Sequence, residues 1–103
     1  MDKKSVEIAR AFAKRLRKVF DLNNIFLFGS RARGDNFLES DFDFVIVSED
    51  FKNIPFIFRA SKIYDYWNQK QDIEPLCYTP EEFEKKKKQI GIVRQAVKEG
   101  IEL

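Results

Sequence analysis

The chain has 103 residues, with 19 lysine and arginine residues, 17 aspartate and glutamate residues and no histidine. Hydrophobic residues make up 44%, which is enough for a compact core in one small domain over residues 1–103. A single cysteine, Cys77, excludes an internal disulfide and a zinc site of the Cys/His type. Without histidine, carboxylates are left as proton carriers and metal ligands, so an enzyme with this sequence would use Mg²⁺ or Mn²⁺.

The net charge of +2 hides an uneven distribution along the chain. Residues 1–34 carry nine basic and three acidic side chains, residues 35–84 four basic and twelve acidic, and residues 85–103 six basic and two acidic. The acidic middle could collect divalent cations, whereas the four lysines at 85–88 are interpreted as a solvated helix face. No run of about 18 apolar residues is present, so we expect a cytoplasmic protein that does not interact with membranes.

The first predicted element is an amphipathic helix over residues 3–20, because apolar residues recur there every three or four positions. Asp2 could cap its first turn. Residues 21–24 are expected to form a turn. The apolar run over residues 25–28 is too short for a helix and is typical of a strand buried on both faces, inside a sheet.

A second strand is predicted over residues 42–47, where side chains alternate between the two faces of the sheet. One face carries Phe42, Phe44 and Ile46, and the other carries Asp41, Asp43, Val45 and Val47. The two aspartates therefore project from one face at the start of the strand. Because like charges repel, this pair indicates a site for a divalent cation.

The following segment is expected to add a second long helix and a third strand. Helical spacing of apolar residues predicts a helix over residues 55–69. Its inward side chains would be Ile57, Ala60, Ile63, Tyr64 and Trp67. A strand over residues 72–78 places Asp72 and Glu74 on one face, and Pro75 favours an edge position or a bulge.

The segment from Thr79 to Glu82 is a strong helix start. Thr79 can cap the helix, Pro80 suits its first position, and Glu82 completes a capping box. We expect this helix to break or bend near Gly91, and the apolar pattern that follows to end at Gly100.

The residues that point to chemistry follow the first predicted strand, in the run Gly29-Ser30-Arg31-Ala32-Arg33-Gly34. A buried strand that ends in Gly-Ser and turns sharply directs backbone N–H groups and a small hydroxyl to one place, which is typical of a phosphate cradle. Gly29 lets the backbone approach a ligand closely, and Arg31 or Arg33 could pair with phosphate oxygens. With the aspartate pair a short distance along the chain, the sequence indicates a Mg²⁺–nucleotide site.

The pattern Gly29-Ser30-x-Ala32-Arg33-Gly34 with Ser40-Asp41-x-Asp43 resembles the signature of the DNA polymerase β-like nucleotidyltransferases. It is most similar to the minimal nucleotidyltransferases, the MNT proteins that are paired with HEPN toxins. Residues 76–83 and the segment around Gly91 are similar to that group as well. The resemblance implies an α/β (α+β) nucleotidyltransferase fold with a small mixed β-sheet flanked by helices. It also implies ATP or another nucleoside triphosphate as donor and two divalent ions, Mg²⁺ or Mn²⁺, bound by the aspartate pair.

The same resemblance implies a third carboxylate from a neighbouring strand. Glu74 and Asp72 are the two candidates, and the position of Glu74 relative to the Thr-Pro-Glu-Glu-Phe segment favours Glu74. The implied catalytic and metal-binding residues are Asp41, Asp43 and Glu74. The implied nucleotide-binding and phosphate-binding residues are Gly29, Ser30, Arg33 and Ser40.

Three functions remain open from the sequence. The first is transfer of AMP from ATP to a hydroxyl of a partner protein, with a HEPN toxin tyrosine as acceptor and this chain as the antitoxin. The second is a non-catalytic nucleotide-binding or toxin-binding module that neutralises its partner by forming a complex. The third, RNA binding through the basic face of the first helix, lacks an RNP or GXXG motif, so we do not expect direct nucleic-acid binding. Because 103 residues leave little room for an acceptor domain, a partner protein or a homo-oligomer is expected to supply it.

Overall fold

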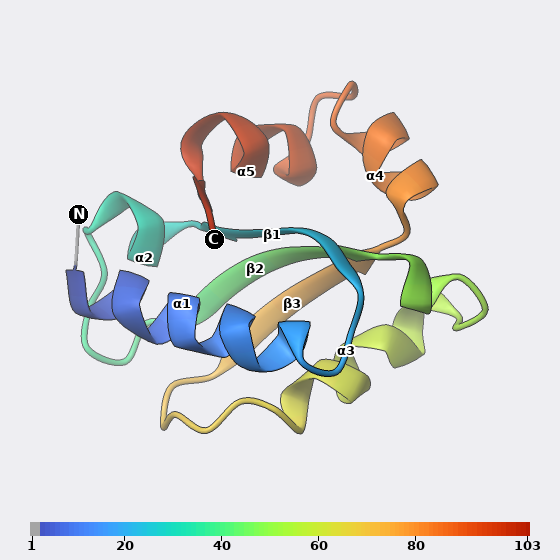
Figure 1. Ribbon diagram of the computed structural model, residues 1–103. Coiled ribbons are helices and arrows are strands. Elements are labelled where there is room, and N and C mark those ends of the chain that lie inside the picture. The colour runs from blue at the N-terminus through green and yellow to red at the C-terminus, as the bar shows by residue number, and fades with distance from the viewer. Residues whose placement is uncertain (1–2) are drawn as a thin grey trace.

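The computed structural model describes residues 3–103, in which one β-sheet lies between two layers of helices (Figure 1). The strands are β1 (Leu22–Phe28), β2 (Phe42–Ser48), β3 (Ile73–Tyr78) and β4 (Ile101–Glu102), in the spatial order β3-β2-β1-β4. Strand β2 runs parallel to β3 and antiparallel to β1, and β4 runs antiparallel to β1. The mixed sheet flanked by helices is therefore confirmed, as is the edge position of the proline-containing β3.

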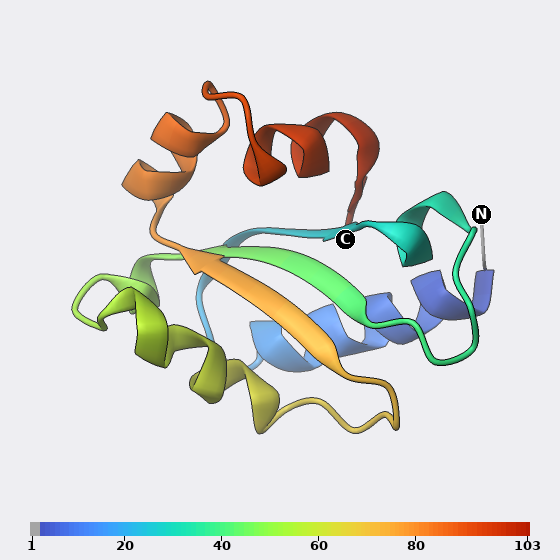
Figure 2. The same ribbon diagram turned by 180° about the vertical axis from the view of Figure 1, so that it is seen from behind.

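The helices divide between the two faces of the sheet (Figures 1 and 2). On one face lie α1 (Lys3–Arg17) and α3 (Phe56–Tyr64), and on the other lie α4 (Pro80–Lys86) and α5 (Ile92–Glu99). The short helix α2 (Ser30–Arg33) follows β1, and a turn of 3-10 helix, η1 (Glu49–Phe51), follows β2. No helix within residues 3–103 is both long and apolar enough to cross a membrane.

Alternation along β2 separates two apolar clusters, one on each face of the sheet. The cluster under α1 and α3 includes Phe12, Phe42, Phe44, Ile46 and Ile63. The cluster under α4 and α5 includes Val45, Val47, Tyr78, Phe83 and Val93. The predicted division of β2 into two faces is confirmed, and the face with Val45 and Val47 is also the face from which Asp43 projects.

Strand β4 and the first residues of β1 were not predicted from the sequence, and they tie the end of the chain to the sheet. Most of the expected turn at 21–24 is the start of β1, where Asn24 Nδ2 donates to Glu102 Oε2 at 3.0 Å. The backbone N–H of Leu103 donates to the carbonyl of Ile25 at 2.9 Å. Helix α1 ends at Arg17 rather than at residue 20. The proposed cap Asp2 lies outside the described residues.

Helix α3 is shorter than predicted and buries a different face. It ends at Tyr64, and residues 65–69 are not helical. The side chains of Ile57 and Tyr64, expected inside, are 78% and 49% exposed, whereas Ile63 is buried as expected and Arg59 is only 5% exposed. The spacing of apolar residues took no account of Arg59, whose side chain is buried because it has hydrogen-bond partners inside the fold.

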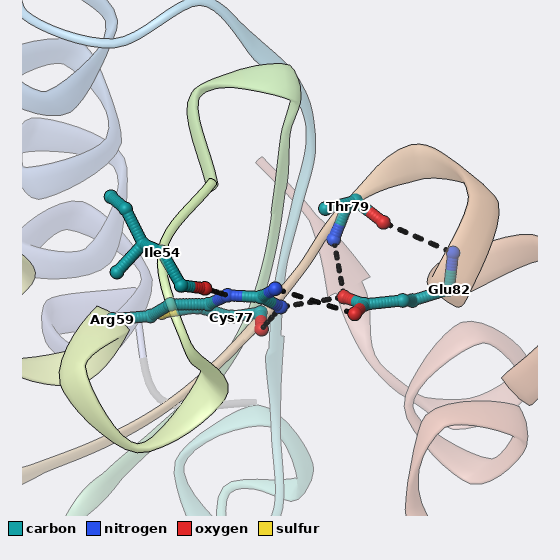
Figure 3. A network of polar contacts seen from close by, with 5 residues as sticks. All are labelled: Ile54, Arg59, Cys77, Thr79 and Glu82. Carbon is teal, nitrogen blue, oxygen red and sulfur yellow. Dashed lines mark hydrogen bonds and ion pairs between the residues drawn. The ribbon is translucent and has the colours of Figure 1, made fainter. Parts of the chain in front are cut away.

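Arg59 joins three elements of the fold (Figure 3). Its Nε donates to the carbonyl of Ile54 at 2.8 Å, its Nη1 donates to the carbonyl of Cys77 at 3.1 Å, and its Nη2 donates to Glu82 Oε2 at 3.3 Å. The same Glu82 accepts from the backbone N–H of Thr79 at 2.8 Å, while Thr79 Oγ1 accepts from the N–H of Glu82 at 3.2 Å. The predicted capping box is thus confirmed, and Glu82 serves both the cap of α4 and the buried arginine.

The helical region after β3 is interrupted where the sequence indicated. Helix α4 ends at Lys86 and α5 begins directly after Gly91, which confirms the predicted break. Gly100 follows the last residue of α5, as expected. Cys77 is buried in β3, and burial raises the pKa of its thiol to about 12, so it is chemically inert at neutral pH.

Candidate active site

Two carboxylates face each other on the α5 side of the sheet, near the point where β1 leads into α2. Asp43 in β2 and Glu74 in β3 are register partners on neighbouring parallel strands, so their side chains leave the same face of the sheet. Their carboxyl groups are close enough to share a hydrogen bond. Residue 28 of β1 is the partner of Asp43 on its other side. Asp43 therefore lies in the inner strand β2, and Glu74 lies beside it in the edge strand β3. Helix α4 follows the far end of β3, away from the end where that strand begins (Figure 2).

Asp43 is the acid most strongly affected by this arrangement. Burial raises its pKa to about 6, with further contributions from the charge and hydrogen bond of Glu74 and from the charge of Asp41, whereas the Arg33 guanidinium acts in the opposite direction. Each of the raising effects disfavours the ionised carboxylate. A positive charge bound here would relieve the repulsion, as would a proton.

Gly29 allows the Asp43 carboxylate to lie against the turn between β1 and α2. The glycine has φ of +74°, a backbone conformation that other residues rarely adopt. A Cβ atom at this position would also collide with Oδ2 of Asp43. The sequence predicted a close approach of a ligand to this glycine, and in the structure the group that approaches it is the side chain of Asp43. Ser30 is the first residue of α2, directly after this turn.

The two candidates for the third carboxylate have different positions in the fold. Glu74 is the register partner of Asp43, whereas Asp72 lies one residue before β3, where its carbonyl accepts from the N–H of Phe42 at 2.9 Å. The structure therefore brings Glu74, rather than Asp72, to Asp43. Asp41 precedes β2, and together with Asp72, Glu74, Tyr64 and Trp67 it lines a groove of about 370 Å³ at the β3 edge.

The acids are suited to a divalent metal by their chemistry rather than by a preformed cluster of ligands. Within residues 3–103, no three histidine, cysteine or acidic side chains form a ready-made coordination group. The chemistry of the donors nevertheless fits, because carboxylate oxygens are the preferred ligands of Mg²⁺ and Mn²⁺. Burial is the largest cause of the raised pKa of Asp43, and the negative charges of Glu74 and Asp41 raise it further. Asp43 and Glu74 would be the core of such a site, and Asp41 adds its charge from two residues along the chain.

Arg31 has a role that sequence reasoning missed. Its side chain is only 5% exposed, so it does not present its charge to a bound phosphate. Instead it donates to the carbonyl oxygens of Leu38 and Ser40, both at 2.9 Å, and to Ser5 Oγ at 3.0 Å. Its guanidinium also lies 4.4 Å from the centre of the Phe42 ring. Arg31 therefore holds the loop that leads into the two aspartates.

The remaining predicted residues have simpler positions. Arg33 is exposed, donates to Asp35 Oδ2 at 3.1 Å, and acts electrostatically on Asp43, so it is the arginine that a phosphate could meet. The Ser40 hydroxyl accepts from the N–H of Phe37 at 2.9 Å and shapes the loop, and its contact with a phosphate stays a prediction. Two residues of α5 that the sequence did not indicate, Gln95 and Glu99, line a cavity beside the Gly29 turn. Only the packing of α5 on β1 brings them there.

Comparison with known proteins agrees with this arrangement. Residues 7–102 match the family model described as the nucleotidyltransferase domain. Among solved structures, a candidate nucleotidyltransferase from Sulfolobus solfataricus is similar with a TM-score of 0.64 and 20% identity, over 99% of this chain and 87% of that chain. At this identity the second likeness shows the fold alone. No curated protein matches the chain.

Proposed function

We propose, since the chain belongs to the nucleotidyltransferase domain family, that it transfers a nucleoside monophosphate from a triphosphate to a hydroxyl group, AMP from ATP being the leading case. The observation that supports this most strongly is the Asp43–Glu74 pair held against the turn at Gly29. A half-buried carboxylate beside a second carboxylate is costly, and groups with perturbed pKa values concentrate at functional sites.

In this reaction the acceptor oxygen attacks the α-phosphorus, the bond from that phosphorus to the bridging oxygen breaks, and pyrophosphate leaves. Asp41, Asp43 and Glu74 would hold Mg²⁺ or Mn²⁺, which supplies Lewis-acid charge for the attacking hydroxyl and the departing pyrophosphate. Glu74, the register partner of Asp43, would accept the proton of the acceptor hydroxyl. Arg33 and Ser30 would bind phosphate oxygens, and Arg31 keeps the aspartate loop in position.

The acceptor is proposed to be a partner protein, specifically a tyrosine of a HEPN toxin. The support is the resemblance of the Gly29–Gly34 and Ser40–Asp43 segments to the minimal nucleotidyltransferases that are paired with such toxins. An added AMP group near the RNA-binding site of a ribonuclease toxin would repel the RNA backbone and block cleavage. This chain would then act as the antitoxin by covalent modification.

The proposal is tested by incubating the partner with this protein, ATP and Mg²⁺ and measuring the intact mass of the partner. We expect additions of AMP mass, no addition with the Asp41→Asn/Asp43→Asn variant, and normal addition with Asp65→Asn, an exposed aspartate at the end of α3. Suppression of the toxin without a change in mass would show instead that neutralisation is by binding alone.

A further inference from the structure

Helix α5 covers the same face of the sheet as the acids and borders the Gly29 turn of the candidate active site. Its side chains Gln95 and Glu99 line a cavity of about 170 Å³ together with Phe28, Gly29 and Arg33. The same two side chains also line a broader groove of about 540 Å³ that runs along α5. The other residues of this groove are Ile90, Gly91, Ile92, Arg94 and Lys98. Gln95 and Glu99 therefore stand between the predicted phosphate cradle and a second, larger hollow.

The position of Glu99 is fixed by the way α5 ends. Gly100, the next residue, packs so tightly that an added Cβ would lie 2.7 Å from the carbonyl oxygen of Leu27. Ile101 then pairs with Leu27 in the sheet. Because Leu27 is two residues before Gly29, this close packing holds the last turn of α5 beside the Gly29 turn. Glu99 is thus part of the rigid frame of the site, although its side chain is exposed.

The chemistry of Glu99 restricts what part of a nucleotide it can bind. Gln95 Nε2 donates to Glu99 Oε2 at 3.1 Å, which orients the carboxylate. An ionised carboxylate only accepts hydrogen bonds, and the oxygens of an ionised triphosphate also only accept. A glutamate beside a phosphate cradle therefore repels the triphosphate, and it can favour nucleotide binding only through donors elsewhere in the nucleotide. The donors of ATP are the two ribose hydroxyls and the amino group of the base, and a vicinal diol suits a carboxylate best.

We propose that Glu99, oriented by Gln95, binds the ribose hydroxyls of the nucleoside triphosphate, so that the base lies in the α5 groove against Ile90 and Ile92. These two isoleucines are 93% and 55% exposed and offer an apolar surface to a base. The inference rests on the proposed function, because it takes triphosphate binding at the Gly29 turn as given. It makes the protein selective for ribonucleotides over deoxyribonucleotides.

The test is calorimetric titration of the full chain with ATP and with dATP, both in excess Mg²⁺. We expect ATP to bind about ten times more tightly than dATP, since a hydroxyl that pairs with a charged acceptor is lost. In Glu99→Ala this ratio should fall to about one. The ratio is the informative quantity, because removing a negative charge beside the triphosphate strengthens the binding of both nucleotides alike. Gln95→Leu should lower the ratio partly.

Glu102→Ala is the matched control. It removes a carboxylate three residues further on, in β4, that pairs with Asn24 and does not line either cavity. It should leave the ratio unchanged, and melting curves should show all variants folded. Equal affinity of the native protein for ATP and dATP, or an unchanged ratio in Glu99→Ala, would overturn the inference while the proposed function stands. If neither nucleotide binds, the proposed function fails as well.

Discussion

The two ends of the sheet face beneath α4 and α5 are built in opposite ways. Toward the end of β3, Val47 and Tyr78 pack with Phe83 and Val93 in an apolar cluster. Toward its start, the same face of the same two strands carries Asp43 and Glu74. Within a few residues, the face changes from a close-packed interface into a pair of repelling acids.

The difference shows how so small a chain can support an unfavourable site. The apolar end is reinforced by Arg59, which joins α3, β3 and α4 through Glu82 and the carbonyl of Cys77. The acidic end depends on a glycine turn and on Arg31, which hold charged residues in place without neutralising them. The apolar end thus stabilises the fold, and part of this stabilisation offsets the repulsion between the carboxylates at the acidic end.

The largest expected effect is the loss of activity when Glu74, at the acidic end, is replaced. Glu74→Gln should lower nucleotidyl transfer about a thousandfold and weaken triphosphate binding much less. Its contribution belongs mainly to activating the acceptor hydroxyl, whereas Asp41 and Asp43 retain the charge that holds the metal. Asp72→Asn, at a position that the structure does not bring to Asp43, should cost far less. Single-turnover rates with a protein acceptor give the comparison, and the opposite ranking would make Asp72 the third acid.

The next largest effect concerns the apolar end. Arg59→Met should lower the free energy of unfolding by about 3 kcal/mol, because it removes the hydrogen bonds to the carbonyls of Ile54 and Cys77. Glu82 also loses its ion pair and keeps only its hydrogen bond in the cap of α4. Lys62→Met, an exposed position on the same helix, is the control and should change stability by about 0.5 kcal/mol or less. Urea unfolding measures both, and equal effects would mean that Arg59 does not hold this end together.

Gly29→Ala should have a smaller effect on stability and a clear one on the site. The positive φ and the collision with Asp43 predict a loss of about 1–3 kcal/mol and weaker ATP binding. Gly91→Ala is the matched control for stability, since a Cβ there meets nothing within 4 Å. If Gly29→Ala bound ATP like the native protein, the turn would not be part of the nucleotide site.

The sequence predicted those parts of the molecule that depend on local patterns. Strict alternation fixed the face of Asp43, and the capping box at Thr79 needed only residues three apart. It failed where partners are distant in the chain. Arg59 is buried because it pairs with Glu82, which lies 23 residues further along the chain. Glu99 reaches the site only because β4 pairs with β1. A charged residue gives no local sign of such a partner.

The smallest expected effect is a pH dependence at the acidic end. Because the pKa of Asp43 is raised from 3.8 to about 6, the folded protein binds more protons than the unfolded chain between these values. The contribution of Asp43 to stability is therefore present below about pH 4 and is lost as the pH rises through 6. In chelator, the native protein should lose stability over this range relative to Asp43→Asn, as followed by urea unfolding. Parallel curves for the two proteins would contradict the raised pKa.

The central claim is that the Asp43–Glu74 pair, held against Gly29, binds a triphosphate together with a divalent metal. The most direct measurement is calorimetric titration with ATP, in Mg²⁺ and in chelator, for the native protein and for Asp43→Asn. The account predicts that the native protein binds ATP at least tenfold more tightly with Mg²⁺ and that Asp43→Asn loses this difference. Equal affinity of the native protein for ATP with and without metal would contradict it.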